Sequence, residues 1–211
     1  MNNVKIFVEG IADKKFLSDY IKHILPEFTV IDNKTIIACG GCTGIHSEKD
    51  DMEETIRKTM IKNTNDYGIN IVIFDSDKDF NGRKKEIEKW KVDFNLSFEL
   101  FLFPNNKDKG TLENLLEEII PEKNRPILDC WEGYEKCLKS KTIKERTRPL
   151  TTPAKKTKIY GYLEALVGEN RSEKTKIKEK ERDYGNIDHW DLEAPYLKPL
   201  KEFLIQHLII I

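Results

Sequence analysis

Two short stretches decide the fold of this chain: VKIFVEG at residues 4–10 and IVIFDSDKD at residues 71–79. Each begins with a nearly continuous apolar run, which is typical of a strand buried on both faces of a sheet. Each run then reaches a carboxylate, Glu9 in the first and Asp75 in the second. We expect the second stretch to stay extended, so that Asp77 points the same way as Asp75 and Asp79 repeats the spacing. Carboxylates at the ends of neighbouring parallel strands gather at one edge of the sheet, where a hard divalent cation finds oxygen ligands. The two stretches therefore predict a metal site.

Strands and helices alternate around these stretches through residue 120. Apolar runs predict strands at residues 4–8, 34–39, 69–74 and 97–103. Helical spacing of apolar residues predicts helices from residue 13, over 46–63, over 82–91 and from residue 112. This order predicts an α/β fold, with a mostly parallel sheet of four to five strands flanked by helices. We assign residues 1–120 to this domain.

Residues 121–211 follow a different pattern, which we interpret as a basic, helical C-terminal extension. Helical spacing recurs over residues 126–139, over 159–167 and again near the C-terminus. Residues 169–186 are almost entirely charged and polar, so we expect them to be mobile. From Lys136 to Arg182 there are 15 Lys and Arg against 6 Asp and Glu, a net charge of +9. Since the whole chain carries −1, the remainder carries −10.

A basic block beside an acidic metal site suits a substrate that is itself a polyanion, such as DNA or RNA. The candidate phosphate-contacting residues of the block are Arg146, Arg148, Lys155, Lys156 and Lys158. They would contact backbone phosphates without reading base sequence. The competing interpretation is a solvated, mobile loop without a ligand.

Composition also bears on location. The apolar stretches are far shorter than the roughly 18 residues that a membrane helix needs, so we expect no membrane partner. The first residues show no charged-then-apolar leader. Together with the four cysteines, this predicts a cytoplasmic protein in a reducing compartment.

The two acidic motifs together resemble the Toprim domain, the metal-binding catalytic module of bacterial primases, type IA and type II topoisomerases and OLD-family nucleases. Toprim proteins pair a first-strand Glu, followed by Gly, with a third-strand Asp-x-Asp. Glu9-Gly10 and Asp75-Ser76-Asp77 stand in that order. The resemblance covers about residues 1–120. With FPNN at 103–106, GTLENLL at 110–116 and WDL at 190–192, it extends to small stand-alone, OLD-like Toprim proteins of bacteria with no assigned activity.

The resemblance implies a role for each matching residue. Glu9 would serve as general acid/base or as a metal ligand, and Asp75 and Asp77 would hold Mg²⁺ or Mn²⁺. Asp79 matches a third, less essential Asp of the extended motif. Asp13 matches an acidic position that OLD-type nucleases use for a second metal, although a plain helix N-cap explains it equally well.

The segment after the fourth strand adds two weaker matches. Lys109 stands where OLD-like proteins place a catalytic basic residue, and it would stabilise charge on a phosphate. Glu113 stands near a further acidic position, or it only complements a helix N-terminus.

The function expected from these features is metal-dependent cleavage of phosphodiester bonds in DNA or RNA, in a conditional role such as phage defence or repair. The chain shows no ATPase domain of the kind that OLD nucleases carry, so a separate ATPase or sensor protein is the expected partner. Two alternatives remain. One is a non-catalytic module whose Mg²⁺ positions a nucleic acid or a protein partner. The other is a phosphatase in which Asp75 is the nucleophile and Asp77 the acid.

Overall fold

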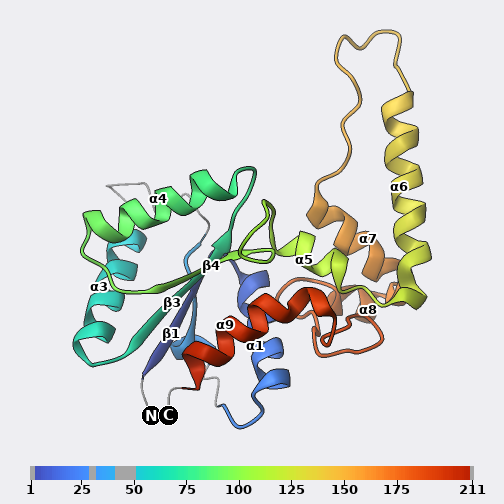
Figure 1. Cartoon of the computed structure of the whole chain (residues 1–211). Coiled ribbons are helices and arrows are strands. Elements are labelled where there is room, and N and C mark those ends of the chain that lie inside the picture. Colours follow the sequence, from blue (N-terminus) through green and yellow to red (C-terminus); the bar gives the residue numbers. More distant parts are fainter. Residues whose placement is uncertain (1–2, 29–31, 41–50, 210–211) are drawn as a thin grey trace.

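The computed structural model describes residues 3–28, 32–40 and 51–209 and shows an α/β fold (Figure 1). Its sheet consists of β1 (Val4–Val8), β2 (Ile36–Ala38), β3 (Ile69–Asp75) and β4 (Glu99–Phe103). All neighbouring strands pair in parallel, in the order β2-β1-β3-β4. The predicted α/β class and parallel sheet are confirmed, with four strands.

The strand order places β1 and β3 side by side. Ile6 pairs with Ile36 of β2 on one side and with Ile71 of β3 on the other. From β1 the chain moves to β2 at one edge and then returns across β1 to form β3. The switch point of the sheet therefore lies between β1 and β3, which is where open parallel sheets bind ligands.

Helices cover both faces of the sheet, which is why its strands are apolar at successive positions (Figure 1). Val72 and Phe74 face a cluster built with α3 (Asp51–Asn65) and α4 (Phe80–Asp93). Ile71 and Ile73 face the opposite cluster, which includes α1 (Ile11–Ile24) and α9 (Lys198–Leu208). Consecutive side chains of β3 thus enter two different cores, as the pleat of a strand requires.

The remaining helices are α2 (Asp32–Thr35), α5 (Leu112–Glu118), α6 (Arg125–Ser140), α7 (Lys155–Val167) and α8 (Arg171–Lys176), with 3-10 turns at Glu122–Asn124 and Pro195–Leu197. The helix expected over residues 46–63 is α3, and its residues 46–50 lie outside the described part of the chain. Within the described ranges, no helix has the length and apolarity that crossing a bilayer demands.

The C-terminal part packs back onto the sheet. One apolar cluster runs from Val4 to Leu208 and includes the fully buried Trp190. The expectation of a mobile segment at residues 169–186 is wrong for its second half, because Arg182 and Tyr184 are buried. The Arg182 guanidinium donates to the Ile177 carbonyl through Nε and Nη2, and to the Tyr184 hydroxyl through Nη1. Hydrogen bonds within the segment thus satisfy the Arg182 guanidinium, although the composition of the segment suggests a solvated side chain.

Candidate functional site

The site lies where β1 and β3 end. Glu9 follows the last residue of β1, and Asp75 is the last residue of β3. The Asp75 backbone N–H donates to Glu9 Oε1 at 3.2 Å. The two acidic motifs therefore lie close together, as predicted. Their strands are neighbours, with Val8 opposite Ile73.

Arg83 binds the Glu9 carboxylate from the first turn of α4. Its Nη2 donates to Glu9 Oε1 at 3.1 Å and its Nη1 to Glu86 Oε2 at 2.8 Å. Only 8% of the Arg83 side chain and 12% of the Glu9 side chain are exposed. Burial raises the pKa of Glu9, although the Arg83 charge and hydrogen bond act against that rise. Glu9 is thus a shielded carboxylate with one fixed cationic partner.

Asp75 is held from the opposite side by α5. The Leu112 backbone N–H, at the start of α5, donates to Asp75 Oδ1 at 2.9 Å. Burial, followed by the charges of Asp13, Glu9 and Glu113, raises the pKa of Asp75 to about 9. An acid in this position gains a proton at neutral pH unless a cation offsets its neighbours.

Asp13 extends the acidic cluster from α1. It is not the N-cap, since α1 begins at Ile11 and Gly10 occupies the cap position. Asp13 Oδ2 instead accepts the Gly10 N–H at 2.7 Å, as the third residue of a capping box does. Burial raises the pKa of Asp13 to about 7; the charges of Glu9 and Glu113 add to the rise, and the Gly10 hydrogen bond opposes it. The capping role is present, and it does not remove Asp13 from the site.

Glu113 is the fourth acid of the cluster. It lies in the first turn of α5, and its Oε2 accepts the Thr111 hydroxyl at 2.7 Å. Its charge raises the pKa values of both Asp13 and Asp75. We call Glu9, Asp13, Asp75 and Glu113 the acidic edge.

Asp77 and Asp79 are arranged differently from the expectation that the Asp-x-Asp stretch continues as extended chain. β3 ends at Asp75, and Asp77 has φ of 53°, in the left-handed region. Asp77 is exposed, and its charge contributes to the raised pKa of Glu9, so it borders the acidic edge. Asp79 is an exposed N-cap residue of α4. The alternation argument for these residues fails because a turn, not a strand, carries them.

The loop of residues 104–111 is tied to the end of β3 by Ser76. The buried Ser76 Oγ lies 2.9 Å from the Asp108 carbonyl oxygen and 3.2 Å from that of Gly110, so its single O–H is shared between them, and it accepts the Gly110 N–H at 2.8 Å. The Gly110 carbonyl in turn accepts the Asp77 N–H at 2.9 Å. This loop carries Lys109, which is exposed and has no ion-pair partner among the described residues.

The basic residues singled out from the sequence divide into two groups. Those of α7 have intramolecular partners: Lys156 pairs with Glu179, Lys158 Nζ lies 2.9 Å from Glu117 Oε2, and Lys155 Nζ donates to Asn114 Oδ1 at 2.6 Å. Arg146 and Arg148 lie in the exposed segment between α6 and α7. The Arg146 guanidinium donates only to backbone carbonyls there.

The acidic edge has the chemistry of a hard-cation site. Its donors are carboxylate oxygens, the ligands of Mg²⁺ and Mn²⁺, and a cation among them would offset the repulsion that raises their pKa values. Within the ranges that the structure describes, however, no three His, Cys, Asp or Glu side chains are gathered closely enough to form a ready-made metal cluster. To bind an ion, the side chains of the acidic edge would therefore have to move closer together. The ion pair with Arg83 would oppose such a movement of Glu9.

Sequence reasoning missed two residues of this region, Arg83 and Ser76. Arg83 lies in a polar helix, where an Arg is usually solvated. Ser76 stands inside the Asp-x-Asp motif at a position that any residue can fill. A signal for Arg83 was its place one helical turn after Asp79, which keeps it close to the motif.

Fold and site together define an α/β protein with an acidic cluster at the switch point of a parallel sheet. The chain belongs to the family described as protein of unknown function (DUF3226), whose model matches residues 3–208. No curated protein and no solved structure matches the chain. The Toprim resemblance of the two motifs stays a prediction.

Proposed function

We propose that this protein is a Mg²⁺- or Mn²⁺-dependent enzyme that cleaves phosphodiester bonds of nucleic acid at the acidic edge. The observation that carries the proposal is the junction of Glu9 and Asp75 at adjacent strand ends, where the Asp75 backbone N–H donates to Glu9 Oε1. Asp13 and Glu113 add charge at the same point. The Toprim resemblance of the two motifs supports the same chemistry.

Each residue of the acidic edge has a distinct task in this proposal. Asp75 would hold the principal ion, with Asp77 bordering it, and Asp13 and Glu113 would supply oxygens for a second. A bound divalent ion neutralises charge on the phosphate and lowers the pKa of a water. Glu9 would accept the proton of the attacking water, and Arg83 would keep that carboxylate oriented.

Lys109 and the electrostatics of the chain favour an anionic substrate. Lys109 is exposed on the loop that Ser76 ties to β3, which leaves its ammonium free to donate to a phosphate oxygen. The block from Lys136 to Arg182 carries a net charge of +9 and would attract a polyanion. The conditional role in defence or repair, with a separate ATPase or sensor as partner, rests on the family resemblance alone.

A second candidate is a non-catalytic module that binds an ion or a nucleic acid without cleaving it. The Glu9–Arg83 ion pair favours this candidate, since it engages the carboxylate that would act as base. An Asp75-nucleophile phosphatase fits less well. That chemistry gives no role to Glu9, whose Oε1 accepts the Asp75 backbone N–H.

The test is cleavage by purified protein with Mg²⁺ or Mn²⁺ on single-stranded DNA, duplex DNA, plasmid and structured RNA. Glu9→Ala and Asp75→Ala should each lower cleavage by about 100-fold or more, while Asp66→Ala should cleave like wild type. Asp66 is a suitable control because it is exposed and precedes β3, at the amino end of that strand.

Calorimetry with Mn²⁺ separates the candidates. If wild type binds Mn²⁺, Asp75→Ala abolishes that binding and no substrate is cleaved, the protein is a non-catalytic binding module. Cleavage that survives in Glu9→Ala and Asp75→Ala would contradict the proposed site.

A further inference from the structure

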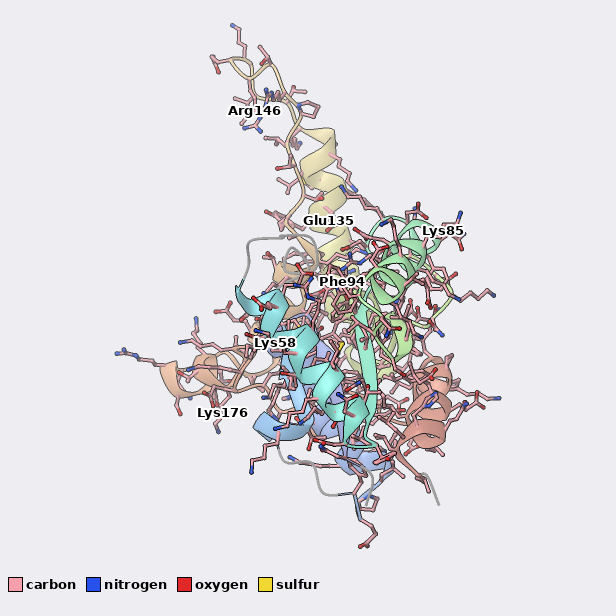
Figure 2. The ribbon with its side chains drawn as sticks, turned by 90° about the vertical axis from the view of Figure 1, so that its left-hand side faces the viewer. Lys58, Lys85, Phe94, Glu135, Arg146 and Lys176 are labelled. Carbon is pink, nitrogen blue, oxygen red and sulfur yellow. The ribbon has the colours of Figure 1, made fainter. Side chains whose placement is uncertain are left out.

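The chain projects an arm beyond the body of the molecule. α6 leads outward, residues 141–154 return without regular structure, and α7 rejoins the core (Figure 1). Figure 2 shows Arg146 at the far end of this projection and Glu135 nearer the body. We call residues 136–154 the distal arm. Residues 141–149 are all exposed, and the only buried residue of α6, Leu128, lies near its base.

The distal arm is uniformly basic. Its Lys and Arg residues are Lys136, Lys139, Lys141, Lys144, Arg146 and Arg148. Glu145 is its one acidic residue, so its net charge is +5. All six cationic side chains are exposed, and none forms an ion pair with another described residue. The lysines of α7, which do have partners, are thus poorer candidates for an external anion.

The composition of the distal arm narrows the kind of anion. Residues 136–154 contain no Phe, Tyr, Trp or His. Proteins that bind single strands combine positive charge with aromatic platforms for the bases, and the distal arm has no such platform. Its larger apolar residues are only Leu138, Ile143 and Leu150, too few for the apolar face of a membrane-surface helix. Charge without stacking fits the regular phosphate backbone of a duplex.

The spacing of the cations agrees with a phosphate backbone. All six lie within the 13 residues from Lys136 to Arg148. An exposed segment with this density of charge brings several cations to phosphates of one backbone.

The base of the arm is bonded to the acidic edge through α5. Lys155, the first residue of α7, donates to Asn114 Oδ1, and the same oxygen accepts the Thr111 N–H at 3.0 Å. The next residue, Leu112, donates to Asp75. A backbone that lies along the arm toward its base thus approaches the helix that holds Asp75.

We propose that the distal arm binds the phosphate backbone of duplex nucleic acid and directs it toward the acidic edge. The identification of the polyanion as nucleic acid rests on the proposed function, and the duplex and the four lysines of the arm are new here. DNA and RNA duplexes share this backbone chemistry, so the experiment includes both.

The experiment is fluorescence anisotropy of the full chain in EDTA, with a labelled mixed-sequence DNA duplex, the matching RNA duplex and the unpaired DNA strand. The arm variant carries Gln at all six distal-arm cations, which keeps helix propensity in α6. The control variant carries Gln at six exposed lysines outside the arm and outside the block from Lys136 to Arg182: Lys22, Lys34, Lys58, Lys62, Lys84 and Lys85. Both variants lose the same formal charge.

With about six phosphate contacts, wild-type affinity for a duplex should fall about 10³-fold between about 50 and 200 mM salt. The arm variant should lose about 100-fold or more of its affinity at low salt and most of its salt dependence. The control variant should stay within about tenfold of wild type. The proposal is overturned if the arm variant binds the duplex as tightly as the control variant does. It is also overturned if the unpaired strand binds as tightly as the duplex and depends on the arm to the same extent.

Cleavage measured in parallel keeps the two proposals separate. Arm-dependent duplex binding without metal-dependent cleavage would end the proposed enzyme activity and leave the arm assignment standing. If Asp75→Ala abolishes cleavage but the arm variant still binds the duplex like wild type, the proposed enzyme activity stands and the arm assignment ends.

Discussion

The acidic edge and the distal arm carry charge under opposite conditions. The carboxylates of the edge are packed between β1, β3, α1 and α5, and burial raises the pKa values of Glu9, Asp13 and Asp75. The cations of the arm are exposed, and none has an ion-pair partner among the described residues. Buried like charges oppose folding, whereas exposed ones contribute little to it. The edge is therefore maintained against stability, as functional sites often are.

The largest effect should come from the cation that supports the edge. Arg83→Met leaves the buried Glu9 carboxylate without its partner and should lower the free energy of unfolding by about 3–5 kcal/mol. Urea unfolding at pH 7 measures it, and Lys84→Met on the same helix is the exposed control. Adding Glu9→Gln to Arg83→Met should restore much of the loss. A double variant as unstable as the single one would show that Arg83 acts through packing alone.

Removing charge from the edge should act in the opposite direction. The folded pKa of Asp75, about 9, lies above its ordinary value of 3.8, so the folded chain binds the proton more tightly. That contribution is fully present below about pH 4 and is lost as pH rises toward 9. In EDTA at pH 7, Asp75→Asn should therefore raise the free energy of unfolding by on the order of 2 kcal/mol.

The pH dependence of this gain is the decisive measurement. The gain from Asp75→Asn should be smaller at pH 5 than at pH 8, as read from urea midpoints. Asp129→Asn, on the exposed surface of α6, should show no such trend. A gain that does not change with pH would mean that folding does not raise the pKa of Asp75.

A smaller loss is expected where the loop of residues 104–111 meets β3. Ser76→Ala leaves the Gly110 N–H without its buried acceptor and should lower the free energy of unfolding by about 1–2 kcal/mol. Thermal or urea unfolding checks this, with the exposed Ser97→Ala as control. If Ser76→Ala is as stable as wild type, the hydroxyl does not anchor the loop.

The smallest effect belongs to the distal arm. The six-fold Gln variant should unfold within about 0.5 kcal/mol of wild type, because its changed side chains are exposed and without ion-pair partners. A destabilisation near that of Arg83→Met would remove the contrast between the two regions. It would also mean that a loss of duplex binding by this variant reflects unfolding.

The sequence predicts the sheet well because its strands are buried on both faces and therefore nearly continuously apolar. The proximity of Glu9 and Asp75 followed once β1 and β3 were taken as neighbours, which the motif order favoured and the strand order confirmed. Asp77 was assigned the wrong backbone conformation, since alternation along a strand says nothing about where the strand ends. The left-handed turn at Asp77 depends on Gly110, whose carbonyl accepts its N–H.

Partnerships between distant charges lay beyond the sequence. Arg83 is buried where it meets Glu9, the residue after β1, although composition alone suggests a surface residue. Lys158 meets Glu117 because α7 packs beside α5, so a basic block that looked uniform divides into paired and unpaired cations. Arg182 and Tyr184 show the same limit in a segment that composition marked as mobile. In each case the partner comes from packing geometry, which a charge pattern does not encode.

The all-parallel pairing of the sheet also bears on when the site forms. Among the described strands no hairpin joins two neighbours, and Val4 pairs with Ile69 across α1, α2, β2 and α3. Such non-local pairing loses the entropy of long loops before its contacts stabilise the sheet. It therefore forms slowly and late in folding. During synthesis, Glu9 leaves the ribosome well before Asp75 and waits without its strand partner. An incomplete chain therefore holds no assembled acidic edge, and any activity of the edge begins only with the folded sheet.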